Sequence, residues 1–335
     1  MQSKVFIILV GWNKWYLTED CLKTLKEIHY DNYRVVVVDN GSDQQTKEAI
    51  KNSPLRQFFY FIENETNLGF AAGNNVGARY AFEQGADYLL LLNNDTVVDD
   101  KDFLNKLVNV AESDKSIGIV GPKIYYYDEL VRQLNKEVPR PLDYAQGKQD
   151  SGQTFVPQAK VWFGGGKLNW LKTEATHLKL EKQTETDFIT GCCLLIKREV
   201  IEKIGLLPEE FFLYFEDADW CLRAREAGYK CVYVPSAWIW HKVAASSGEF
   251  SYNYIYYNTR NGLLMAWRHA LRIGGHALSG IEGQDDIFKK FLIILFSFWL
   301  LIKQLLKLMI GYKKEWSQAM LRGIWDFYRG KFGKM

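Results

Sequence analysis

The stretch Asp87-Tyr88-Leu89-Leu90-Leu91-Leu92-Asn93-Asn94-Asp95 decides the fold that we predict for this chain. Its apolar and aromatic run is too short for a typical helix and is bounded by polar residues, which is typical of a parallel strand covered on both faces. Ligands of open α/β sheets bind at the carboxyl ends of the strands. Asn93, Asn94 and Asp95 would emerge at that edge, where a carboxylate can hold a metal ion or the three residues can simply form a turn.

Alternating strand and helix patterns surround this strand. Apolar runs predict three earlier strands at residues 5–10, 34–39 and 58–62, and apolar residues at helical spacing predict helices at about 17–28, 44–51 and 67–82. After the stretch we expect a helix at 102–112 and a short strand at 117–120, which Gly121 and Pro122 would end. This order predicts an α/β fold with a mostly parallel sheet and right-handed crossovers.

The pattern is less regular farther along. Residues 125–160 are rich in charge and proline, and we expect them to run over the surface, where they can contact an acceptor. The next elements predicted are a buried strand at 188–196, a helix at 198–204 and a strand at 230–234. The last is followed by an aromatic run that ends in a lone histidine, His241. Glu216, Asp217 and Asp219 begin a further helix that ends at Gly228; acids are favoured there by the helix dipole, but three in four residues exceed what a cap requires.

Size and composition limit the function classes. The 335 residues suffice for one large domain with an appendage or for two domains, and 42 basic against 40 acidic residues give no overall sign of nucleic-acid binding. Aromatic residues, at 15%, suit sugar or membrane-interface contacts as well as a core. Five cysteines without zinc-site spacing indicate reduced thiols of a cytoplasmic protein, and the short apolar start lacks the cleavage site of a signal peptide.

Six short motifs follow one another between residues 5 and 268. They are Gly11-Trp12-Asn13, Val38-Asp39-Asn40-Gly41-Ser42, Asn67-Leu68-Gly69-Phe70 with Gly73-Asn74-Asn75, Asn93-Asn94-Asp95, Phe215-Glu216-Asp217-Ala218-Asp219-Trp220, and Trp240-His241. In this order they resemble the family 2 glycosyltransferases with the GT-A fold, most nearly the rhamnosyltransferase-like bacterial branch that builds surface polysaccharides. The resemblance implies a Rossmann-like sheet sandwiched by helices over residues 1–250, followed by a helical C-terminal region over residues 251–335.

The same resemblance implies a donor site. The nucleotide-binding residues would be Trp12, Asn13, Asp39, Asn67, Gly69, Gly73, Asn74, Asn93 and Asn94. Glycine permits close approach of the backbone to a diphosphate, although Gly69 and Gly73 can also be turn residues. Asp95 and His241 would bind a divalent cation, Mg²⁺ or Mn²⁺. Asn93 and Asn94 depart from the acidic form of this motif and leave one carboxylate in it.

Asp217 matches the catalytic base of the family. It would accept the proton of the acceptor hydroxyl that attacks the anomeric carbon, and a single displacement of this kind inverts the anomeric configuration. Glu216, Asp219 and Trp220 are expected to contact acceptor or sugar, with a structural role in the helix as the alternative for Asp219. The resemblance favours dTDP-L-rhamnose as donor and a saccharide or lipid-linked saccharide as acceptor. A UDP-sugar transferase and a non-catalytic nucleotide-sugar-binding relative are the alternatives.

Other enzyme classes lack their motifs in this sequence. There is no GxGxxG opening a helix, no phosphate-binding loop and no HExxH, so a dehydrogenase or a phosphate-loop nucleotidase is not indicated.

The end of the chain has a different composition. Residues 289–335 contain ten Lys or Arg against Glu315 and Asp326, and an apolar run at 291–302 lies between Lys290 and Lys303. Because a membrane-spanning helix needs about 20 apolar residues, we expect an amphipathic helix in the membrane interface with lysines toward anionic headgroups. This predicts a peripheral protein at the inner face of the plasma membrane. The alternatives are a helix packed on the catalytic domain, a homo-oligomer contact and a tilted span.

Overall fold

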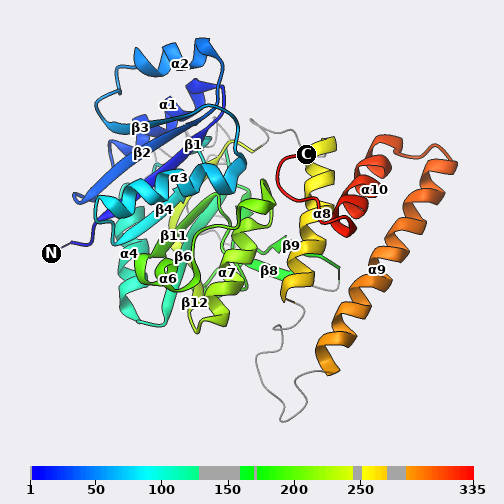
Figure 1. Cartoon of the computed structure of the whole chain (residues 1–335). Helices are drawn as coiled ribbons and strands as arrows, with labels where there is room; N and C mark the ends of the chain where they lie inside the picture. Colours follow the sequence, from blue (N-terminus) through cyan, green and yellow to red (C-terminus); the bar gives the residue numbers. More distant parts are fainter. Residues whose placement is uncertain (1, 128–158, 170–171, 244–250, 270–283) are drawn as a thin grey trace, which may run out of the picture.

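The computed structural model describes residues 2–127, 159–169, 172–243, 251–269 and 284–335 (Figure 1). In these residues one ten-stranded sheet has the order β10-β12-β6-β11-β4-β1-β2-β3, with β5 on β12 and β7 on β6. The strands are β1 Val5–Gly11, β2 Tyr33–Asn40, β3 Phe59–Asn64, β4 Tyr88–Leu92, β5 Thr96–Val97, β6 Ile117–Tyr126, β7 Val161–Phe163, β10 Thr184–Glu185, β11 Cys193–Lys197 and β12 Lys230–His241. A separate hairpin pairs β8 Gly166–Asn169 with β9 Glu174–His177.

Helices cover the sheet and continue beyond it. They are α1 Trp15–Leu25, α2 Gln44–Lys51, α3 Gly69–Glu83, α4 Phe103–Ser113, α6 Arg198–Ile204, α7 Glu216–Glu226, α8 Tyr252–His269, α9 Gln284–Met309 and α10 Lys314–Tyr328, with the 3-10 turn η1 Glu209–Phe211. The predicted α/β fold is confirmed, since β4, β1, β2 and β3 are neighbouring parallel strands. Figure 1 shows α8, α10 and α9 in succession outward from the sheet.

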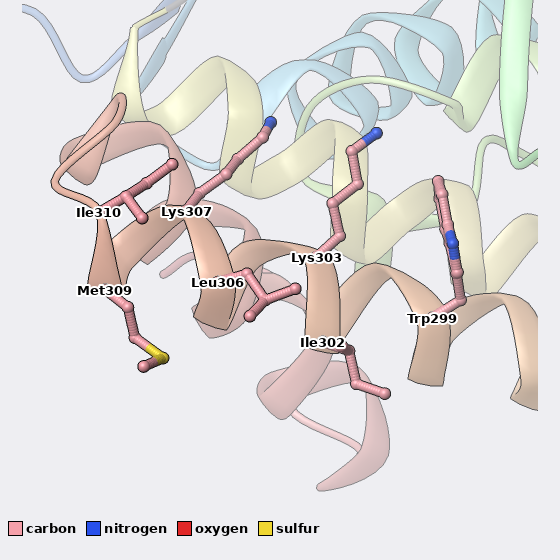
Figure 2. A pocket seen from close by; sticks show the side chains of 7 residues that line it. All are labelled: Trp299, Ile302, Lys303, Leu306, Lys307, Met309 and Ile310. Atoms are coloured by element: carbon pink, nitrogen blue, oxygen red, sulfur yellow. The ribbon is translucent and has the colours of Figure 1, made fainter.

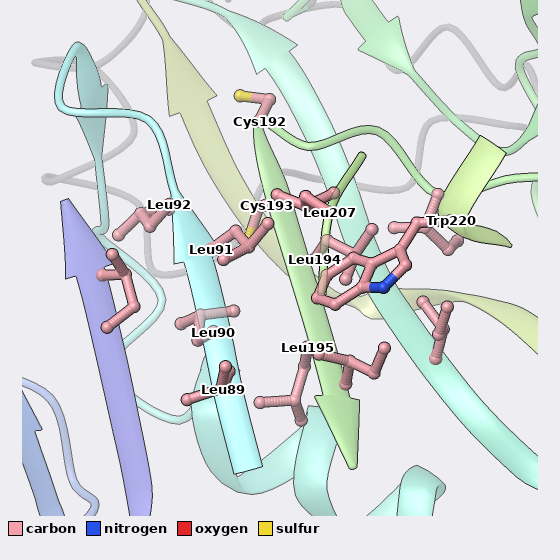
Figure 3. Packing of buried hydrophobic residues seen from close by; sticks show 14 of the residues in the cluster. Leu89, Leu90, Leu91, Leu92, Cys192, Cys193, Leu194, Leu195, Leu207 and Trp220 are labelled. Carbon is pink, nitrogen blue, oxygen red and sulfur yellow. The ribbon is translucent and has the colours of Figure 1, made fainter. Parts of the chain in front are cut away.

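The leucine strand β4 lies in the middle of this sheet, as predicted. All five of its residues are buried, because β1 flanks it on one edge and β11 on the other (Figure 3). β11 is antiparallel to β4, and Leu194 pairs with Leu91. Trp220 of α7 lies by β11, on the side away from β4, with its ring fully buried (Figure 3). The end of β4 therefore rests on a rigid core.

Three predicted strand boundaries are wrong. β6 runs through Gly121 and Pro122 to Tyr126, because the register of its neighbour β12 shifts beyond Val234, opposite Pro122, whose nitrogen cannot donate. For the same reason the strand predicted at 230–234 continues to His241 as β12. Conversely, the strand predicted at 188–196 begins only at Cys193, since residues 189–192 turn their backbone toward the site described below.

Candidate active site

A cavity of about 960 Å³ opens at the carboxyl ends of β1 and β4. Its walls come from the loops after these strands, the first turns of α3 and α7, the end of β12, helix α8 and the last residues of the chain. The predicted site residues that line it are Trp12, Asn13, Asn67, Gly69, Asn93, Asn94, Asp95, Glu216, Asp217 and His241. Since Asn40 also lines it, the cavity brings together residues from all six motifs.

The loop after β1 forms one rim of the cavity. The Asn13 backbone N–H donates to Ser42 Oγ at 2.7 Å, and the Asp43 N–H donates to Asn13 Oδ1 at 3.0 Å. These two hydrogen bonds hold Asn13 in a left-handed conformation with φ 56°. The neighbouring Trp12 ring is 55% exposed. Asp39, which we expected beside the nucleoside, is buried and does not line the cavity. Burial raises the pKa of its carboxyl, although hydrogen bonds from Ser42 oppose the shift.

Helix α3 is attached to the same rim. The Asn40 side-chain amide donates to the Gly69 carbonyl at 3.0 Å and to Asn67 Oδ1 at 3.2 Å. Gly69 has φ +85°, and a Cβ there would lie 2.4 Å from the Phe212 carbonyl oxygen. Gly73 and Asn74 face the protein interior rather than the cavity, since a Cβ on Gly73 would meet Val10 at 2.9 Å and the Asn74 amide donates to the Phe70 carbonyl. The two glycines therefore permit packing of α3 in this structure.

The two residues before Asp95 also have protein partners. The Asn93 backbone N–H donates to the Cys192 carbonyl at 2.9 Å, and the Asn94 amide donates to Thr18 Oγ1 at 2.8 Å. Both residues nevertheless line the cavity.

Asp95 and His241 meet at the bottom of the cavity. They are brought together because the short strand β5 pairs with the end of β12, placing Thr96 opposite His241. Asp95 Oδ1 and His241 Nε2 are 3.1 Å apart, yet Asp95 Oδ1 is buried without a hydrogen-bond partner. Two adjacent ligands of an octahedral ion at about 2.1 Å would be separated by about 3.0 Å, so this spacing fits a shared divalent cation.

The remaining ligands of such an ion would come from elsewhere. Within the described ranges, no group of three or more His, Cys, Asp and Glu side chains can hold a metal. Two protein ligands leave several coordination positions for phosphate oxygens and water, which is typical of Mg²⁺ bound with a nucleotide.

Asp217 lines the same cavity from the first turn of α7. Its Oδ2 accepts from the Gly191 N–H at 2.7 Å, which is why residues 189–192 do not continue β11. Its Oδ1 accepts from the Ala218 N–H at 2.7 Å. Burial raises the pKa of Asp217, and these hydrogen bonds limit the rise. A half-buried carboxylate held in this way can accept a proton from a bound hydroxyl group.

Glu216 is more deeply buried, at 4% exposure. Its Oε2 has no hydrogen-bond partner, and burial together with the negative charge of Asp217 raises its pKa well above the usual range. The residue lines the cavity, so its carboxyl group can form a hydrogen bond with a ligand there.

Asp219 and Trp220 do not reach the cavity, contrary to our expectation of sugar contacts. Asp219 is 1% exposed and accepts from Arg223 Nε at 2.9 Å and from His269 Nε2 at 3.0 Å. The Trp220 indole donates to the Gly205 carbonyl in the core. A helix turns by about 100° per residue, so positions two and three beyond Asp217 point into the protein.

Sequence reasoning missed a second group of cavity residues. They are Trp162 and His177 from β7 and β9, Tyr254, Tyr257 and Asn258 from α8, and Lys334 and Met335 from the chain end. The His177 ring packs against Trp162, and burial lowers its pKa to about 4. The only sequence signal for the α8 residues is a run of tyrosines in a helical pattern, and it does not say which face meets the cavity.

Known proteins resemble the chain in sequence and in structure. A family model described as glycosyl transferase family 2 matches residues 6–205. The chain is 26% identical to the low-salt glycan biosynthesis hexosyltransferase Agl10 of Haloferax volcanii, over 97% of this chain and 92% of that protein. It is 22% identical to the dTDP-rhamnosyl transferase RfbF of Shigella flexneri, over 79% of this chain and 80% of that one.

The structure of the mannosyltransferase PcManGT from Pyrobaculum calidifontis, in complex with GDP-Man and Mn²⁺, superposes with a TM-score of 0.56 at 15% identity. The alignment covers 99% of this chain and 88% of that one. A second solved structure, GalNAc-T7 with UDP, GalNAc and Mn²⁺, has a TM-score of 0.53 at 15% identity, over 92% of this chain and 58% of that one. The fold is the GT-A fold.

Proposed function

Because the chain belongs to glycosyl transferase family 2, we propose that it moves a sugar from a nucleoside-diphosphate sugar to a saccharide acceptor with inversion at the anomeric carbon. One observation carries this proposal: Asp217 and the Asp95–His241 pair line the same cavity from different elements. A proton acceptor and a cation site in one cavity meet the two needs of glycosyl transfer, removal of the acceptor proton and stabilisation of the departing diphosphate.

Asp217 acts as the general base in this proposal. The Gly191 and Ala218 N–H groups hold its two oxygens in place, and the raised pKa makes it a stronger proton acceptor than an exposed aspartate. An acceptor hydroxyl that loses its proton to Asp217 attacks the anomeric carbon from the face opposite the leaving diphosphate. One displacement of this kind inverts the configuration.

Asp95 and His241 would hold the divalent cation. Mg²⁺ or Mn²⁺ bound there would neutralise charge that develops on the diphosphate. The site is compatible with either ion, because carboxylate oxygen and imidazole nitrogen both bind Mn²⁺ and the carboxylate binds Mg²⁺.

The donor that we propose is dTDP-L-rhamnose. This choice is supported by the motif order and by the likeness to a dTDP-rhamnosyl transferase. A UDP-hexose or UDP-N-acetylhexosamine is the alternative, since another relative is described as a hexosyltransferase. A non-catalytic nucleotide-sugar-binding role is the third possibility, against which stands the joint presence of Asp95, Asp217 and His241 in the cavity.

A ligand panel with and without metal tests the donor and metal roles. The melting temperature of the full chain is measured with dTDP-rhamnose, UDP-sugars and GDP-mannose, each with Mn²⁺, Mg²⁺ or EDTA. The true donor raises the melting temperature by mass action, and EDTA removes the rise. Release of nucleoside diphosphate is measured in parallel and separates a transferase from a binding protein.

Matched variants sharpen this test. Asp95→Ala and, less severely, His241→Ala should abolish the metal-dependent rise. His29→Ala is the control, because His29 Nδ1 lies 3.1 Å from Asp102 Oδ1 in the same kind of pair on the exposed surface. If EDTA and both cavity variants leave donor binding and turnover unchanged, the metal role is wrong.

We further propose that helix α9 attaches the protein to the cytoplasmic surface of a membrane, where a lipid-linked saccharide would be presented. By length and composition, Lys290–Met309 is apolar enough to cross a membrane, and 17% of it is buried. The helix is continuous through Lys303 and Lys307 to Met309.

Helix α9 exposes far more apolar surface than a helix packed in a water-soluble domain does. Its inner face buries Ile293 together with Ser297 and Gln304, whose side chains hydrogen-bond to Tyr328 and Ser317 of α10. Its outer face exposes Phe291, Ile294, Leu295, Phe298, Trp299, Ile302, Leu305, Leu306 and Met309. Figure 2 shows Ile302 and Met309 on the side opposite Lys303 and Lys307. Lipid is the environment that suits this arrangement, with lysines beside it for anionic headgroups.

Vesicle binding tests this attachment. Replacing Phe298, Leu306 and Met309 with glutamine should weaken co-sedimentation with anionic vesicles at least tenfold, because each such side chain contributes about 1.5–3 kcal/mol on leaving water. Tyr60→Gln, at a similarly exposed aromatic on β3, is the control. Replacing Lys303, Lys307, Lys313 and Lys314 with glutamine should remove the salt dependence. If the parent binds no vesicles and the glutamine variant instead turns a dimer into a monomer, α9 is an oligomer contact.

A further inference from the structure

Part of the lining of the cavity belongs to none of the six motifs. It consists of Tyr254, Tyr257 and Asn258 of α8 and of Lys334 and Met335, and we call this part the distal subsite. We propose that the distal subsite binds the acceptor and that Lys334 recognises a phosphate or diphosphate group on it. This inference rests on the proposed function, because it assigns the acceptor of the same reaction.

The chain end is anchored in the wall of the cavity. The Gly333 N–H donates to the Glu210 carbonyl at 2.7 Å, and the Gly333 carbonyl accepts from Arg260 Nη1 at 2.8 Å. The Met335 N–H donates to the Tyr257 hydroxyl at 2.9 Å. These bonds fix the backbone on both sides of Lys334, so its side chain begins from a defined position. Arg260 is 1% exposed, and its guanidinium also donates to the Phe211 carbonyl at 3.0 Å.

Aromatic rings join this end to the catalytic helix. Phe212 stacks on Tyr257 with ring centroids 5.3 Å apart, and Tyr214 meets Tyr254 edge-on at 5.2 Å. Phe212 and Tyr214 belong to the loop that leads directly into Glu216 and Asp217. The aromatic wall and the proposed base are therefore parts of one connected unit. Flat aromatic rings beside hydroxyl and amide groups suit the faces of a sugar.

Lys334 offers a cation to an anionic group in this part of the cavity. Over the part of the chain that the structure describes, Lys334 makes no ion pair, and it is exposed to the cavity. Tyr257 accepts a hydrogen bond from Met335 through its oxygen, which leaves its own proton to donate. An ammonium group and a hydroxyl donor on one wall match the oxygens of a phosphate. The phosphate can belong to a lipid-linked saccharide or to a free sugar phosphate.

Calorimetric titration of the full chain separates these cases. The protein is first saturated with Mn²⁺ and the nucleoside diphosphate that stabilises it, so that the donor phosphate site is filled. Geranyl phosphate, glucose 1-phosphate and geraniol are then titrated at constant ionic strength into the parent and into Lys334→Met, Lys334→Arg and Lys331→Met. Lys331 is the matched control, because it is an exposed lysine of the same segment that does not line the cavity.

We expect Lys334→Met to weaken binding of both phosphates about five- to tenfold, and Lys334→Arg to stay within about threefold of the parent. Lys331→Met should bind like the parent, and geraniol should not respond to any variant. Tighter binding of geranyl phosphate than of glucose 1-phosphate identifies a lipid-linked source, and the reverse order a free sugar phosphate.

Equal phosphate affinities in the parent and in Lys334→Met, or an equal loss in Lys331→Met, overturn the proposal. Binding of the nucleoside diphosphate in the initial saturation step distinguishes this result from a failure of the proposed function. If the parent binds no nucleoside diphosphate, the transferase function fails, whereas normal nucleoside diphosphate binding with Lys334-independent phosphate binding removes the distal subsite alone.

Discussion

Asn261 of α8 provides the sharpest test of how the site is held together. Its side chain is fully buried, and its amide group donates to the carbonyls of Phe211, Leu213 and Tyr214 at 2.8, 2.8 and 3.0 Å. Its oxygen accepts from Arg260 Nε at 2.9 Å. Three residues of this loop, Phe212, Tyr214 and Phe215, have φ between 63° and 73°, a conformation that ordinary side chains disfavour and that the surrounding structure must hold.

The change Asn261→Ala removes the two amide protons that the three carbonyls share and the oxygen that accepts from Arg260, and it leaves buried carbonyls without partners. At about 1–1.5 kcal/mol for each bond and about 1–3 kcal/mol for unpaired groups, the free energy of unfolding should fall by about 3–5 kcal/mol. For a chain of this length the entropy of unfolding is about 0.7 kcal/mol per kelvin, so the melting temperature should drop by about 4–7 °C. Turnover at saturating donor should fall more than donor affinity does, because the loop positions Asp217.

Thr259→Val is the matched control on the same helix. Thr259 is buried, and its hydroxyl donates within α8 to the Ile255 carbonyl at 2.8 Å. Valine keeps the shape of the side chain, and the Ile255 carbonyl keeps its backbone hydrogen bond within α8. The free energy of unfolding should therefore fall by about 1 kcal/mol or less. Calorimetric melting and steady-state kinetics measure both variants. If Asn261→Ala melts and turns over like Thr259→Val, the loop is not held by α8.

Three further outcomes follow from the same contacts. Asp217→Asn should lower turnover by about two to four orders of magnitude with donor affinity retained, and near-normal turnover of the variant would move the base elsewhere. Since burial raises the pKa of Asp217, the acid limb of the parent's pH–rate profile should lie above the ordinary aspartate range. Gly69→Ala should lower the free energy of unfolding by about 1–3 kcal/mol, because the φ of Gly69 is +85° and the new methyl group meets the Phe212 carbonyl. Chemical denaturation measures this, and a stability equal to that of the parent would contradict it. Burial lowers the pKa of His269, but hydrogen bonds to Asp219 at 3.0 Å and Glu226 at 2.7 Å outweigh it and raise the pKa overall. Protonated His269 therefore adds to the free energy of unfolding in full below about pH 6.5, and this contribution is lost as the pH rises through the higher pKa of the folded state. Urea denaturation of His269→Gln should show a smaller fall of the free energy of unfolding with pH. An unchanged pH dependence would exclude His269 as its source.

The α/β class of the fold and the position of Asp95 at a strand end that lines the cavity were predictable from local sequence. The run of leucines in β4 needs burial on both faces, and Asp95 follows it at a strand end where ligands gather. Asp217 was identified by its motif, and its position in a first helical turn agrees with the structure. These features depend on residues that are neighbours in the chain.

The rest depended on contacts between distant segments. Pro122 looks like a strand end until β12 shifts its register beside it, and Asp219 looks like a sugar ligand until Arg223 and His269 bind it. Lys334 has no motif, and only the folding of α8 and α10 brings it to the cavity. No local pattern encodes such placements, because each is set by tertiary packing.

The bonds from α8 also define where this protein can be recombined with others. A chimera that joins residues 1–250 to the helices of another transferase would lose Arg260 and Asn261, the two side chains that hold the backbone in front of Asp217. A workable junction therefore lies after His269, whose ring also binds Asp219 of α7. With that junction, helix α9 becomes an exchangeable part, provided that the helices of the other transferase still deliver a segment to the Gly333 position beside Glu210.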